Sequence, residues 1–144
     1  MPTDIVSVME PGFERVYAIR DWYDGPRDGA ADYRGSPHRF RSVYLENDRW
    51  DPDEDRFELT PLPPHVLPWM VEAHELWQRY LAALRAGLAP QLAPDSPGVL
   101  PEDRARYEAL ERQVEAALAE LGPTVMARGE FSLREPTVRW RAIE

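Results

Sequence analysis

The fold is decided by a stretch with strand character, Phe13-Glu14-Arg15-Val16-Tyr17-Ala18-Ile19-Arg20. Successive side chains of a strand point to opposite faces of a sheet, so Phe13 and Tyr17 share one face while Val16 lies on the other. Both faces hold apolar groups, which is typical of a strand that is covered on both sides. The stretch therefore predicts a β-strand over residues 13–20.

Three further strands are predicted downstream, over residues 30–34, 38–46 and 57–59. Glycine and proline punctuate the chain before and between them, at residues 24–29 and 35–37, because glycine supplies positive φ and proline presets its own φ. An acidic loop over residues 47–55 precedes the last of these strands. Together the four segments predict an antiparallel meander.

Two helices and a hairpin are predicted beyond the meander. Residues 66–86 and 101–121 carry apolar side chains at helical spacing of three to four positions. Residues 127–134 and 138–142 alternate in polarity again, around a turn at Glu135-Pro136. This order predicts one α+β domain over residues 1–144, in which an antiparallel sheet (N-terminal four-strand meander plus C-terminal hairpin) packs against two helices on one face.

The amino-acid composition argues against several classes of function. The net charge is −9, which repels phosphate backbones and disfavours nucleic-acid binding. All 17 basic residues are arginine, so a lysine Schiff base or phosphate-loop lysine is excluded, and the absence of cysteine excludes thiol chemistry. The sequence contains neither a long apolar run for crossing a membrane nor a secretory signal, so we expect a cytoplasmic location.

No metal or cofactor is expected from the histidines or from known motifs. His38, His65 and His74 share no metal-ligand spacing, and Gln78 stands where the HExxH zinc helix needs its second histidine. Phosphate-binding glycine loops and the GxSxG nucleophile elbow are absent. His74 is interpreted as a satisfied helix histidine, with a general base facing the sheet as the alternative.

The acidic loop resembles a calcium loop only in its first half. Asp51, Asp53 and Asp55 have the D-x-D-x-D spacing, but Arg56 replaces the glycine of the sharp turn and Leu62 replaces the bidentate glutamate. The loop therefore predicts no calcium binding tighter than about millimolar.

One cluster points to a binding site. Large aromatic, basic and acidic residues flank two turns between Trp22 and Phe40. Aromatic walls, an arginine fork and a carboxylate suit a planar or anionic small molecule. Alternatively, the aromatic residues are core, the charged residues pin a turn and the histidine bonds to the backbone. The candidate ligand-binding residues are Trp22, Asp24, Arg27, Tyr33 and His38.

The same segment carries a resemblance. Its pattern W-Y-D-G-P-R-x-G-x-A-x-Y-x-G-x-P-H-x-F, over residues 22–40, together with the acidic loop and a helix containing tryptophan, resembles a family of short bacterial proteins. No activity is attached to that family, so the resemblance implies only that residues 22–40 are the informative region.

The sequence thus predicts a non-catalytic binding or interaction protein, of the immunity or accessory type, with a protein or a small anionic molecule as partner. The alternative is a small-molecule-binding protein or small enzyme with its site between Trp22 and Phe40. A third possibility is a regulatory module docked to another protein. Catalytic residues are not assigned.

Overall fold

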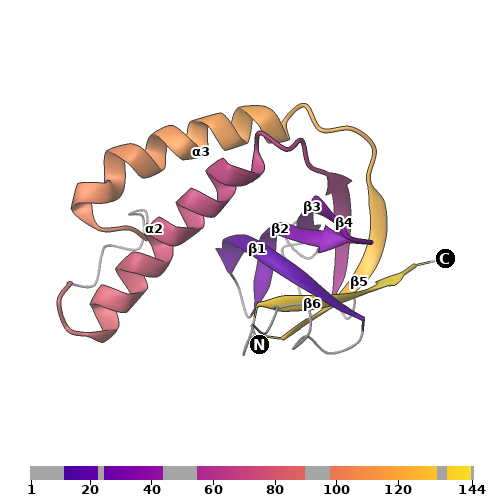
Figure 1. Cartoon of the computed structure of the whole chain (residues 1–144), viewed down its shortest axis with the longest axis horizontal. Coiled ribbons are helices and arrows are strands. Elements are labelled where there is room, and N and C mark those ends of the chain that lie inside the picture. The colour runs from indigo at the N-terminus through magenta and orange to yellow at the C-terminus, as the bar shows by residue number, and fades with distance from the viewer. Residues whose placement is uncertain (1–11, 23–24, 44–54, 90–97, 133–135, 144) are drawn as a thin grey trace, which may run out of the picture. The chain divides into compact units, whose positions relative to one another are not determined.

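The structure is a computed structural model that describes residues 12–22, 25–43, 55–89, 98–132 and 136–143 (Figure 1). Its strands and its helices belong to two different compact units of the chain. The strands belong to the unit Met1–Pro63 with Leu121–Glu144, and the helices to the unit Pro64–Glu120. Whether the two units form one domain stays a prediction. No helix in the described part combines the length and apolar character needed to cross a membrane.

The described strands form a closed antiparallel barrel in which each strand pairs with its sequence neighbour and the last pairs with the first. Their bounds are β1 Phe13–Trp22, β2 Pro26–Tyr33, β3 Ser36–Ser42, β4 Arg56–Pro61, β5 Val125–Ser132 and β6 Thr137–Ala142. Closure is made by β1 and β6, in the register Phe13 with Arg139, Glu14 with Val138 and Arg15 with Thr137.

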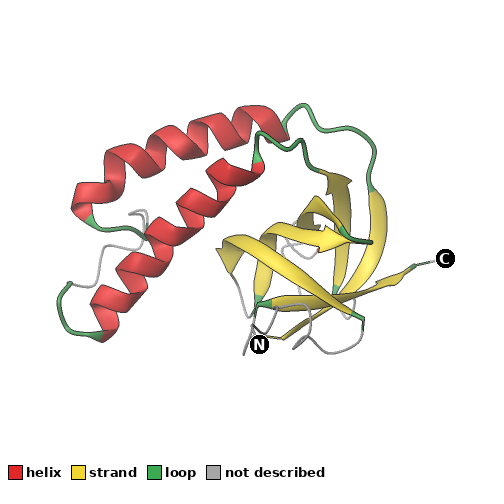
Figure 2. Cartoon of the chain, viewed as in Figure 1, coloured by secondary structure: helices red, strands yellow, loops and turns green. Residues whose placement is uncertain are grey.

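The predicted open sheet packed against two helices is therefore wrong. The alternating segments do form antiparallel strands, but the meander and the hairpin join at both ends and leave a barrel (Figure 2). Alternation defines each strand and says nothing about whether the outer strands meet. Closure pairs backbone groups that an open sheet leaves at its edges, where they invite association with other chains.

The pairing of β1 with β2 is irregular, which is typical of a strongly bent strand in a barrel. The register shifts between Val16 and Ala18, between Ile19 and Asp21, and between Asp21 and Trp22. An extra residue in one strand bends that strand and increases its twist. Apolar groups on both faces of residues 13–20 thus belong to a bent barrel strand.

β2 begins earlier than the sequence predicted. Residues 26–29 were interpreted as part of a turn, but they form the first half of the strand. Gly29 lies in the strand because a side chain has no room there: a Cβ atom would lie 2.1 Å from the Ala18 carbonyl oxygen and 2.8 Å from the Phe40 ring. Among the described residues of the predicted turn, Gly25 has the positive φ expected of a turn glycine, +117°.

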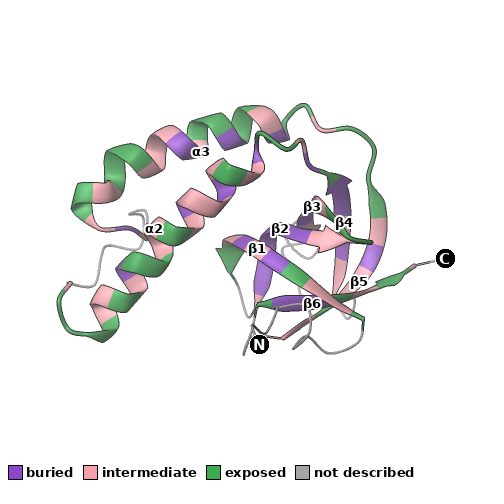
Figure 3. Ribbon diagram, viewed as in Figure 1, coloured by how far each residue is buried: buried purple, intermediate pink, exposed green. Residues whose placement is uncertain are grey.

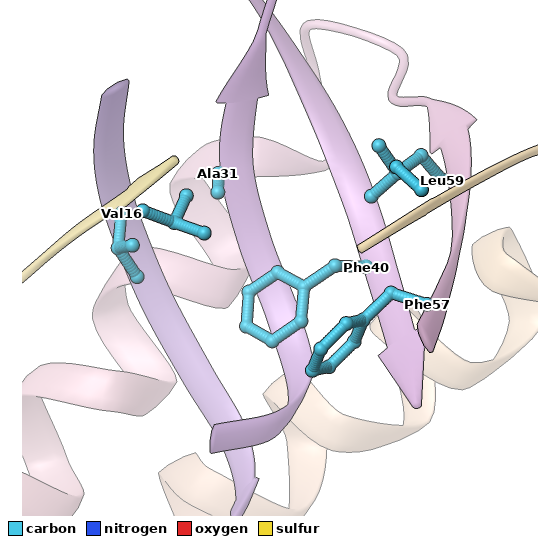
Figure 4. Close-up of a cluster of buried hydrophobic side chains, with 7 residues drawn as sticks. Val16, Ala31, Phe40, Phe57 and Leu59 are labelled. Atoms are coloured by element: carbon cyan, nitrogen blue, oxygen red, sulfur yellow. The ribbon is translucent and has the colours of Figure 1, made fainter. Parts of the chain in front are cut away.

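Aromatic side chains fill the interior of the barrel. The rings of Phe40, Phe57, Phe131 and Trp140 all contact one another, with centroids 5.2–6.1 Å apart. Figure 4 shows two of them, Phe40 and Phe57, beside the aliphatic part of the core. Gly129 faces this cluster, because a Cβ atom there would lie 2.5 Å from the Trp140 ring. The lumen is therefore a packed core.

The helical unit is an antiparallel hairpin of α2 Leu67–Arg85 and α3 Arg104–Leu118, the latter preceded by a short 3-10 helix, η2 Pro101–Asp103. Its apolar stripes are buried at positions such as Met70 and Leu110, while the opposite faces are exposed (Figure 3). Glu72 accepts two hydrogen bonds from the Arg106 guanidinium, at 2.6 and 2.7 Å. Hydrogen bonding to Arg106 lowers the pKa of the Glu72 carboxyl below its ordinary value.

Replacing Gly29 by alanine is expected to destabilise the barrel by about 3 kcal/mol or more, because the new methyl group overlaps a backbone oxygen that has no freedom to move. Chemical denaturation of the full chain measures this. Gly122→Ala is the matched control, since a Cβ atom there meets nothing within 4 Å. Equal stability of the two variants would contradict the packing described for β1, β2 and β3.

Candidate functional site

The residues predicted to bind a ligand do not gather at one place. Trp22 ends β1 with 45% of its surface exposed, whereas Arg27 is 5% exposed and His38 9% exposed. Tyr33 is partly buried at the end of β2. The fifth predicted residue, Asp24, lies outside the described residues.

Tyr33 and His38 are brought together. Their rings meet edge to face with centroids 5.3 Å apart. His38 Nδ1 lies 2.8 Å from the Ser36 carbonyl oxygen, to which it donates because a carbonyl only accepts. This arrangement matches the interpretation in which the histidine bonds to the backbone.

Trp22 and Arg27 lie at the other end of β2. Register places Trp22 opposite Pro26 and His38 opposite Ala31. Arg27 and Ala31 are about 13 Å apart along an extended strand. The barrel therefore separates the predicted arginine fork from the predicted histidine.

The polar cluster that does form on β1, β2 and β3 is centred on an aspartate that was not predicted to be a site residue. Asp28 accepts from Arg39 through Nε at 3.2 Å and Nη2 at 2.9 Å, and from Arg20 Nη1 at 3.3 Å. The Asp28 and Arg20 side chains are each only 10% exposed. Such buried, bidentate pairing holds three strands in register.

A second charged feature of the described strands is a row of three arginines across adjacent strands. Arg56 on β4 lies directly opposite Arg128 on β5, and Arg128 lies directly opposite Arg141 on β6. Phe57 and Ala127, their neighbours in sequence, belong to the core, so the arginines face outward. We call these three residues the arginine row.

The strands as a whole are basic although the chain is acidic. They carry nine arginines and six aspartates or glutamates, against a net charge of −9 for the chain. Asp55, at the end of the predicted acidic loop, accepts from Arg128 Nη1 at 2.6 Å. Its partners in the calcium-like spacing, Asp51 and Asp53, lie outside the described residues. Within the described ranges no group of three or more metal-ligating side chains occurs.

Two aromatic rings of β1 are covered by guanidinium groups of the chain itself. Arg139 lies 5.2 Å from the Phe13 ring centroid, and Arg15 lies 4.9 Å from that of Tyr17. Tyr17 also donates to Asp32 Oδ1 at 3.0 Å. Burial and this bond raise the pKa of the Tyr17 phenol above its ordinary value of 10.0.

Comparison with known proteins adds no assignment: no protein-family model, curated protein sequence or solved structure matches the chain.

Replacement of Arg27 by alanine is expected to destabilise the barrel by about 1–3 kcal/mol, because the side chain is buried and its aliphatic stem packs in the wall. Thermal or denaturant unfolding measures the loss. Arg112→Ala, at an exposed position of α3, is the control and should change stability by less than about 0.5 kcal/mol. An Arg27→Ala variant of unchanged stability would contradict a structural role for Arg27.

The Tyr17 pKa is expected to fall in Asp32→Asn, since the hydrogen bond and the charge of Asp32 both raise it. A raised pKa in the folded state stabilises the fold below pH 10.0, and that contribution is lost as the pH rises through the folded pKa. Phenolate absorbance, with Tyr17→Phe subtracted as the reference, follows the titration. A Tyr17 pKa unaffected by Asp32→Asn would show that burial alone sets it.

Proposed function

We propose that this chain is a non-catalytic binding protein whose barrel takes an anionic partner on the outer face of β4, β5 and β6. The observation that carries the proposal is the arginine row, in which three adjacent strands present one guanidinium each on the same face. Like charges directly opposite each other on a sheet destabilise it. Asp55 of the chain already bonds to Arg128 in the middle of the row, and an anionic partner would add further negative charge beside Arg141.

The packed lumen supports an external surface as the binding site. Small barrels that hold a ligand do so inside, where side chains leave space. Here mutually contacting aromatic rings occupy the interior, so a ligand would have to displace core side chains. The outer face is the part of the barrel that carries concentrated charge.

The alternative, a small-molecule site between Trp22 and Phe40, has weaker support. Its proposed arginine lies on β2 and its proposed histidine on β3, about 13 Å apart along the strands, and both are buried. Only the Tyr33 and His38 pair retains the predicted proximity. A single small ligand does not reach both halves of the predicted cluster.

The proposal is tested with three labelled polyanions of different chemistry: an oligoglutamate peptide, an oligothymidylate and inorganic tripolyphosphate. Fluorescence anisotropy at low salt is expected to show that at least one binds, and that binding weakens as salt is raised. In the double variant Arg56→Gln/Arg141→Gln, the affinity is expected to fall about tenfold or more, because each charge-assisted hydrogen bond contributes about 1.5–3 kcal/mol.

The control is Arg104→Gln/Arg112→Gln, which removes the same charge from exposed positions of α3. It is expected to bind as the unmodified chain does. Binding that is equal in both double variants would assign the effect to net charge and contradict the proposal. Absence of binding by all three probes would contradict it as well.

A further inference from the structure

We draw no further inference here: the strongest candidate, the side-chain cluster of β1, β2 and β3 in which Asp28 accepts hydrogen bonds from Arg20 and Arg39, carries nothing, because both guanidiniums are already engaged by a carboxylate of the chain itself and nothing in the structure shows what covers them.

Discussion

Closure of the barrel around its aromatic core is the constraint on which the rest of the structure depends. Four large aromatic side chains fill the interior, those of Phe40, Phe57, Phe131 and Trp140. A small barrel leaves little space for them, and glycine residues in the strands provide that space because they carry no side chain. Gly29 lets the β1 backbone approach and accommodates the Phe40 ring. The packing of the Phe40 ring and of the β1 backbone therefore requires glycine at position 29.

Closure of the barrel also determines on which face of each strand the charged residues lie. Once the interior is apolar, every second residue of each strand faces outward, and here many of these residues are arginines. On β1 to β3 the arginines are neutralised close by, as Arg20 and Arg39 are by Asp28. On β4 to β6 the register instead aligns arginines with arginines. Even there, Arg128 pairs with Asp55 and Arg139 with Glu130, so arginine–carboxylate pairs occur in both halves of the wall.

Much of the secondary structure followed from the sequence, and the tertiary closure did not. Alternation located the strands, and helical spacing located α2 and α3, because both signals are local. Gly29 was misread as a turn residue, since a glycine required for close approach and a glycine required for positive φ look the same in one sequence. The pairing of Phe13 with Arg139 joins residues at opposite ends of the chain, and no local pattern encodes it.

The prediction of the site failed for the same reason, because sequence patterns report only on residues that are close in the chain. Residues 22–40 are rich in suitable side chains, but strand geometry places His38 and Arg27 far apart, although they are close in sequence. In the arginine row the relation between distance in sequence and distance in space is reversed. Arg56 and Arg128 are distant in sequence and directly opposed in the barrel, so only the register reveals them. Alternating arginines at positions 139 and 141 were a visible signal, but one strand alone does not distinguish a solvated face from a binding surface.

The net charge of the chain and the charge of its strands differ in sign. A value of −9 averages over all residues, whereas a ligand responds to charge within about 10 Å at moderate salt. The strands hold more arginines than acids, and the arginine row concentrates three of them within neighbouring strands. The proposed function therefore depends on the charge close to β4, β5 and β6, where Asp55 and Glu130 already pair with Arg128 and Arg139, and not on the net charge of the whole chain.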